Sequence, residues 1–139
     1  MRIVMDANVL VSGMLTPFGV CGEIVRMLTS GNLILCVDAR ILFEYEDVLR
    51  RSRFKIENKM TDLLMEYIEN TSETHFSMPL PKSLPDPDDN QFIEVAVSAN
   101  VDCLITGNLK HFPLRSRCGI TVLNPRSFLD AVKKRKTKW

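Results

Sequence analysis

The chain has only two histidines, His75 and His111, and its four cysteines lie far apart in the sequence. Structural zinc sites use closely spaced cysteine and histidine ligands, so this composition argues against one. Most of the cysteines lie in or beside apolar runs, which favours buried free thiols over a disulfide framework. The cysteines are Cys21, Cys36, Cys103 and Cys118.

Long apolar runs and an excess of one charge are also missing. No segment approaches the roughly 20 apolar residues of a membrane span, and the N-terminus shows no basic segment followed by an apolar one. We therefore expect a cytoplasmic protein with no membrane partner. The formal net charge of +1 does not by itself predict a nucleic-acid partner.

Several catalytic signatures are absent. The sequence has no paired serine and histidine, no cysteine close to a histidine, no phosphate-binding loop ending in Gly-Lys-Ser/Thr and no dinucleotide glycine fingerprint. These absences narrow the choice of chemistry without identifying it.

What the sequence does have is an alternation of apolar runs with segments of helical spacing. The predicted strands cover residues 2–6, 33–37, 74–78, 103–106 and 120–123. The predicted helices cover residues 21–28, 38–49, 57–69, 87–99 and 125–132. Continuous apolar strands alternating with helices are typical of a parallel sheet covered on both faces. We predict an α/β three-layer sandwich with a five-stranded, mainly parallel sheet, formed as one domain by residues 1–132 and followed by a basic tail, 133–139.

Asp6 is an acid at the end of a predicted strand with an unbroken apolar run, Ile3-Val4-Met5. Ligands of open parallel sheets bind beyond the carboxyl ends of the strands, so Asp6 is well placed to meet a cation or a phosphate. A hydrogen-bonded turn aspartate is the alternative interpretation.

Other polar side chains are expected near the same edge of the sheet. Helical geometry places Asp89 on the inward line of its helix and turns Asp88 away from it. Glu44 and Glu46 lie on opposite sides of the apolar stripe of their helix. Helical periodicity does not show which of the two faces the other acids. The fourth strand ends in Thr106-Gly107-Asn108. Several acids in one cleft suit magnesium or manganese, which prefer oxygen ligands and can activate water against a phosphodiester.

Five segments together resemble the successive motifs of PIN-domain proteins, and they match best the branch of toxin components of toxin-antitoxin pairs. The segments are Ile3–Leu10, Glu44–Leu49, Asp86–Asn90, Leu104–Asn108 and Val122–Arg126. The resemblance implies a PIN-like sandwich and a magnesium- or manganese-dependent ribonuclease. It makes Asp6 and Asp89 the central metal ligands and favours Glu44 over Glu46 as the third catalytic acid.

The chain departs from this family pattern at Asn108, where the resemblance leads us to expect a fourth acid. Asparagine coordinates through its carbonyl without adding charge, so a second metal is expected to bind less strongly. Asp86 and Asp88 are supporting candidates, although each also has an explanation as a helix-start residue. Thr106 and Asn8 are further supporting candidates.

Three functions remain open at this stage. The favoured one is a ribonuclease toxin acting on single-stranded RNA, whose partners are RNA, an antitoxin protein and, as a further candidate, a second copy of the chain. The second is a PIN fold that binds RNA or protein without cutting. The third is an aspartyl-nucleophile phosphotransferase, suggested by Asp6 and Asn8 but lacking the second aspartate of that signature.

Two clusters of basic residues are candidates for contacts with RNA phosphates. Cations also favour the C-terminal ends of helices, which is the simpler interpretation of each cluster. In the ribonuclease interpretation, the first cluster binds the RNA backbone. That cluster is Arg50, Arg51, Arg53 and Lys55, and the second lies in the tail ahead of Trp139.

Overall fold

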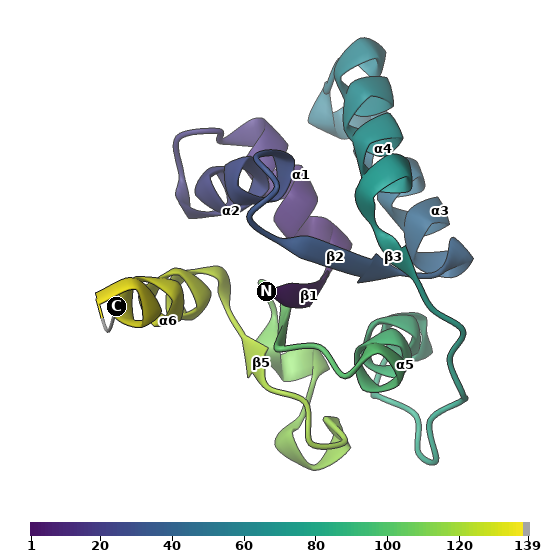
Figure 1. The fold of residues 1–139 in the computed structure, drawn as a ribbon. Helices are drawn as coiled ribbons and strands as arrows, with labels where there is room; N and C mark the ends of the chain where they lie inside the picture. The colour runs from purple at the N-terminus through teal and green to yellow at the C-terminus, as the bar shows by residue number, and fades with distance from the viewer. Residues whose placement is uncertain (138–139) are drawn as a thin grey trace.

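The computed structural model describes residues 1–137, and the strands in this range form one sheet in which every pairing is parallel. The strands are β1 (Arg2–Met5), β2 (Ile34–Val37), β3 (Glu73–Thr74), β4 (Cys103–Ile105) and β5 (Val122–Leu123). Their order across the sheet is β3-β2-β1-β4-β5, with β1 in the middle (Figure 1). The predicted five-stranded parallel sheet is confirmed.

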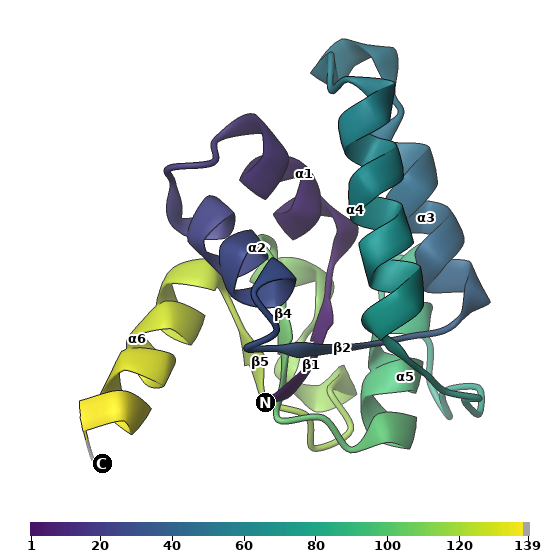
Figure 2. The same ribbon diagram turned by 45° about the horizontal axis from the view of Figure 1, so that its top comes forward.

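Helices cover both faces of this sheet. The α-helices are α1 (Ala7–Leu15), α2 (Val20–Thr29), α3 (Ala39–Leu49), α4 (Asn58–Thr71), α5 (Asn90–Ala99) and α6 (Pro125–Thr137). Short 3-10 turns are η1 (Ser52–Phe54), η2 (Pro87–Asp89), η3 (Leu109–His111) and η4 (Leu114–Ser116). Helices α1 and α2 lie on the side of the sheet opposite α5 (Figure 1). Helices α3 and α4 run side by side (Figure 2) and both contact β2.

The predicted elements differ from the observed ones mainly at their ends. Helix α1 was not predicted. The third strand is two residues long instead of covering 74–78, and the fifth begins at Val122 instead of 120. Helix α6 continues to Thr137, five residues beyond the predicted end, so it includes much of the basic tail. Lys138 and Trp139 lie outside the described residues.

The order of the strands positions the site. The chain moves from β1 to β2 and β3 in one direction, and β4 and β5 lie on the other side of β1. The connections therefore diverge between β1 and β4, which is where an open parallel sheet forms a crevice at its carboxyl edge. Asp6 follows β1 at this point and Thr106 follows β4, so the two residues flank the crevice.

The expectation of buried thiols is met by two of the four cysteines. All four cysteines are free; Cys36 and Cys103 are buried, and Cys118 is exposed. Within residues 1–137, no single helix has the length and hydropathy of a membrane span, and only α1 and α2 taken together, with a bend of 103° between them, reach that threshold.

Candidate metal centre

Asp6 is held from β4. Its backbone N–H donates to the carbonyl of Ile105 at 2.9 Å, and its Oδ2 accepts a hydrogen bond from the Thr106 hydroxyl at 2.9 Å. Only 5% of the residue is exposed, and this burial raises the pKa of the carboxyl, while the bond from Thr106 opposes the rise. Thr106 is thus a buried hydrogen-bond partner of Asp6.

The start of α1 also faces the Asp6 carboxylate. The backbone amides of Ala7 and Asn8 lower the pKa of Asp6, but they do not close a capping hydrogen bond to its side chain. A carboxylate in this position is stabilised by the positive end of the helix dipole. The Asn8 side chain itself is exposed.

Asp89 lies at the end of η2, where α5 begins, and faces inward as predicted, with 9% of the residue exposed. Burial is the main cause that raises its pKa to about 6, the charge of Asp6 raises it further, and the charge of His111 lowers it. The Oδ2 atom of Asp89 is buried and has no hydrogen-bond partner among the described residues. An unpaired carboxylate oxygen is costly to bury, so this atom calls for an explanation.

Glu44, on α3, is the member of the ambiguous pair that interacts with these acids. Burial raises its pKa to about 7, followed by the charges of Asp6, Asp89 and Asp88. Glu46 instead forms an ion pair with Arg50, with 3.0 Å between Oε1 and NH2.

Tyr45 links α3 to the strand that carries Asp6. The side chain is fully buried, and its hydroxyl donates to the carbonyl of Met5 at 2.5 Å. Glu44 and Asp6 are the immediate neighbours of these two residues, so this hydrogen bond joins the segment of α3 that carries Glu44 to the strand that leads to Asp6. Sequence reasoning had identified Tyr45 only as an apolar helix position.

The aspartates before Asp89 have separate positions. Asp86 is exposed, and its Oδ1 accepts from the backbone N–H of Asp88 at 3.0 Å, which confirms the predicted cap. Asp88 is exposed and lines an open cleft of about 690 Å³ together with Glu44, Gln91 and Arg51. The cleft therefore joins one of the acids to a member of the first basic cluster.

Asn108 and His111 lie on the loop after β4. Asn108 is exposed; its backbone N–H donates to the Thr106 hydroxyl, and its side-chain nitrogen lies 2.9 Å from Nε2 of His111. The other ring nitrogen, Nδ1, is 3.2 Å from Oδ2 of Asp89. Sequence reasoning missed His111, and the spacing Asn108-x-x-His111 on one 3-10 turn is the signal that it passed over.

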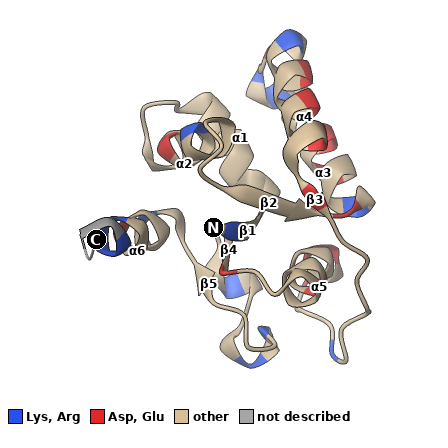
Figure 3. Cartoon of the chain, in the orientation of Figure 1, with Lys and Arg blue, Asp and Glu red and all other residues tan. Residues whose placement is uncertain are grey.

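The first basic cluster lies at the turn between α3 and α4 (Figure 3) and is partly neutralised. Arg50 pairs with Glu46 and with Asp62, at 2.5 Å from the latter, and Arg51 pairs with Asp47 at 3.3 Å. The guanidinium carbon of Arg53 lies 4.8 Å from the centre of the Phe54 ring. The remaining member, Lys55, has a left-handed backbone, with φ 53°.

A second cluster, away from Asp6, brings three potential metal-ligand atoms close together. Among residues 1–137, the only group of three metal-type side chains with ligand atoms within 4.8 Å of one another is Cys36, Glu73 and His75. Arg2 neutralises this group, because its guanidinium pairs with Glu73 at 2.7 Å and, with His75, lowers the pKa of Glu73 to about 2. A cation would have to displace Arg2 to bind there.

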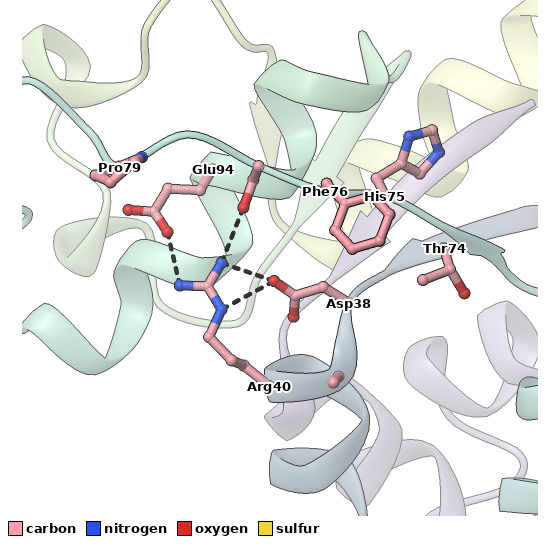
Figure 4. Close-up of a pocket in the computed structure, with 9 residues that line it drawn as sticks. Asp38, Arg40, Thr74, His75, Phe76, Pro79 and Glu94 are labelled. Atoms are coloured by element: carbon pink, nitrogen blue, oxygen red, sulfur yellow. Dashed lines mark hydrogen bonds and ion pairs between the residues drawn. The ribbon is translucent and has the colours of Figure 1, made fainter.

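A separate pocket of about 350 Å³ lies between the start of α3, the strand β3 and α5. Arg40 crosses it and forms ion pairs with Asp38 and Glu94, both at 2.7 Å, and a hydrogen bond with Ser77 (Figure 4). Glu94 also accepts the backbone N–H of Leu80. These bonds pair the charged groups in the pocket. The ion pair between Arg40 and Glu94 joins α3 to α5.

The residues around Asp6 fit a divalent cation better than either of these places. The charge of Asp6 raises the pKa of both Glu44 and Asp89, and the buried Oδ2 of Asp89 has no hydrogen-bond partner among the described residues. Both features are relieved by a cation, and hard cations select oxygen ligands. The three acids are spaced more widely than the Cys36 group, because their ligand atoms do not all lie within 4.8 Å of one another.

Two solved structures share this fold. The VapBC2 structure from Rickettsia felis, bound to a DNA fragment from the promoter, aligns with a TM-score of 0.58 and 14% identity over 89% of this chain and 98% of the other. PAE2754 from Pyrobaculum aerophilum aligns with a TM-score of 0.60 and 12% identity over 96% and 90%. No curated protein sequence matches the chain.

The sequence itself matches the model of the PIN domain over residues 2–110. This stretch contains four of the five strands and all the acids described above, from Asp6 to Asp89. With a match over most of its length and a parallel sheet of the same fold as these two structures, the chain belongs to the PIN-domain family.

Proposed function

We propose that this protein is a metal-dependent ribonuclease that hydrolyses phosphodiester bonds of single-stranded RNA. The observation that carries the proposal is the buried Oδ2 of Asp89, which has no hydrogen-bond partner among the described residues and meets only the ring of His111 at 3.2 Å. It is accompanied by the carboxyls of Asp6 and Glu44, whose pKa values are raised. Unpaired acids in one crevice destabilise the fold, so their presence is best explained by a bound cation. Membership of the PIN-domain family supports a nuclease.

In this proposal Asp6, Glu44 and Asp89 hold Mg²⁺ or Mn²⁺. When bound, the cation would lower the pKa of a water molecule and neutralise charge on the phosphate. The protein's own contribution is positional. Thr106 orients the Asp6 carboxylate, and Tyr45 fixes α3 so that Glu44 faces the same crevice.

The substrate path is inferred from the cleft beside Glu44. Arg51 and Arg40 are the cations that line it beside Glu44. Both arginines are paired in the protein, Arg51 with Asp47 and Arg40 with Asp38 and Glu94, so an RNA phosphate would compete with these acids. We include Arg50, Arg53 and Lys55 in the proposed RNA contact, although Arg50 is already paired with two acids.

The toxin assignment is part of the same proposal. It is supported by the resemblance of the five sequence motifs to the toxin branch and by the likeness of the fold to VapBC2. An antitoxin protein is the partner that this assignment implies.

The decisive assay uses purified protein and labelled single-stranded RNA with Mn²⁺, Mg²⁺ or EDTA. We expect cleavage with either metal and none with EDTA, and loss of cleavage in Asp89→Asn. Cleavage that survives both EDTA and Asp89→Asn would overturn the proposal, as would failure to cut any RNA with either metal.

A binding module without catalysis is the second candidate, and the uncharged Asn108 is the observation that favours it. Asn108→Asp separates the two. A ribonuclease limited by its weak fourth ligand should bind Mn²⁺ more tightly and cut faster in this variant, with Asp6 still required. A binding module should bind RNA with the same affinity before and after the change and should not cut it.

A further inference from the structure

His111 lies beside Asp89 of the candidate metal centre, and both of its ring nitrogens have polar neighbours. The side chain lies at the end of η3 and is 44% exposed. One ring nitrogen lies 3.2 Å from Asp89, and the other lies 2.9 Å from Asn108, so the imidazole bridges an acid and an amide.

The contact between His111 and Asp89 is close without being a hydrogen bond. Nδ1 and Oδ2 are 3.2 Å apart, yet Oδ2 remains without a hydrogen-bond partner among the described residues. Two atoms that bind one metal at right angles, with bonds of about 2.1 Å, lie about 3.0 Å apart. The observed separation matches that of two neighbouring ligands of one ion, and it is also the separation of the His–Asp ion pair that the two side chains form without metal.

We propose that His111 is a metal ligand through Nδ1 and shares one ion with Asp89. This inference rests on the proposed function, because it concerns the ion in the same centre. His111 then supplies the fourth protein ligand on the loop where Asn108 provides no acid.

Asn108 takes a different role in this arrangement. Amide oxygen and nitrogen positions are assigned from hydrogen bonds, so turning the side chain places Oδ1 against Nε2 at the same distance. Asn108 then accepts the Nε2–H, which leaves Nδ1 free of a proton. Metal-bound histidines commonly donate their other N–H to a carbonyl in this way. Asn108 is thus a positioning residue for His111.

The inference has a consequence for metal choice. Magnesium prefers oxygen ligands, whereas an imidazole nitrogen binds transition metals more tightly. A centre that contains His111 should favour Mn²⁺ over Mg²⁺, and the preference should depend on this ring.

The test compares His111→Gln with His75→Gln, which removes the other histidine of the chain and leaves the centre intact. Mn²⁺ is added to each protein, and electron spin-echo spectra detect nitrogen bound directly to the metal. We expect nitrogen coupling in the native protein and in His75→Gln, and no coupling in His111→Gln. Isothermal titration should show Mn²⁺ affinity falling at least tenfold in His111→Gln, with Mg²⁺ affinity changing less than threefold.

A labelled sample makes the test independent of folding in the variant. His75→Gln protein made with ¹⁵N-histidine should show the ¹⁵N coupling pattern in place of ¹⁴N. Mn²⁺ bound without any nitrogen coupling would overturn the role of His111 and leave the proposed function standing. Failure of the native protein to bind either metal would overturn both.

Discussion

At the scale of single residues, the acids of the candidate centre oppose the stability of the protein that contains them. The pKa of Glu44 is raised to about 7 and that of Asp89 to about 6, with burial as the first cause and the charges of other acids next. A raised acid pKa means that ionisation is less favourable in the folded chain than in the unfolded one.

Asp89→Asn should therefore stabilise the metal-free protein while abolishing its Mn²⁺ binding. Removing one charge relieves the repulsion with Asp6, and we expect a gain on the order of 1 kcal/mol, or about 3 °C in Tm. Thermal unfolding in EDTA and isothermal titration measure the two effects. The control is Asp86→Asn, because asparagine can also cap η2. If Asp89→Asn unfolds while Asp86→Asn does not, Asp89 has a structural role.

The same pKa shifts predict how stability changes with pH. For an acid with a raised pKa, the folded state binds more protons than the unfolded state, so stability falls as pH rises. For Glu44 the loss spans the range from its ordinary pKa of 4.5 to about 7. We expect the metal-free protein to have a higher Tm at pH 5 than at pH 8.

Glu44→Gln should reduce this pH dependence, and Glu46→Gln should not. Glu46 is paired with Arg50, outside the group of interacting acids. Saturating Mn²⁺ should reverse the slope, because ionised carboxylates bind the metal. A larger effect of Glu46→Gln would show that the assignment of Glu44 is wrong.

Sequence reasoning located the acids but not their partners. Asp89 could be placed inward from helix periodicity, and Asp6 from the apolar strand before it. Glu44 could not be separated from Glu46 by periodicity, since both flank the apolar stripe, and the family resemblance was needed. His111 was missed because its contact with Asp89 depends on the irregular loop after β4, which has no periodic pattern.

At the scale of secondary structure elements, the strands were predicted and α1 was not. All of its apolar positions except the last turn are buried, so the helix has little of the polar–apolar alternation from which helices are recognised. The length of β3 was overestimated. Only Glu73 and Thr74 pair with β2, and Phe76, which was expected to lie in this strand, is exposed.

The packing of α1 and α2 depends on a glycine. A Cβ atom added to Gly22 would lie 2.1 Å from the carbonyl oxygen of Pro17, a backbone atom that cannot easily move. We expect Gly22→Ala to cost about 1–3 kcal/mol of unfolding free energy, measured by urea denaturation. Gly107→Ala is the matched control, since a Cβ there meets nothing within 4 Å. Equal stability of the two variants would contradict this packing.

At the scale of the whole molecule, the charge is nearly balanced, so the RNA binding that we propose would depend on local clusters of charge. Arg51 lines the cleft beside Glu44, whereas Arg50 is held by Glu46 and Asp62. The slope of log RNA affinity against log salt concentration should become shallower by about one in Arg51→Gln. It should change much less in Arg50→Gln. Filter binding between 50 and 200 mM salt measures both; equal slopes in all three proteins would remove this cluster from the RNA path.

The three-layer architecture was predictable because apolar strands alternating with helices have few other solutions. The order of the strands was not, because the sequence does not show on which side of β1 the chain returns. That order decides which residues share the crevice. The sequence could therefore name candidate residues of the site, but it could not show which of them lie next to one another.

The hydrogen bond from Thr106 to Asp6 joins residues 100 positions apart, and the partner of the Asp6 backbone N–H, Ile105, is almost as distant. A chain that grows from its N-terminus makes Asp6 among its first residues, but it cannot orient that carboxylate until β4 has been synthesised. Long-range strand pairing is also slow to form. A partly synthesised chain therefore carries Asp6, Glu44 and Asp89 without their final arrangement, and the activity that we propose would be absent until β4 has been added.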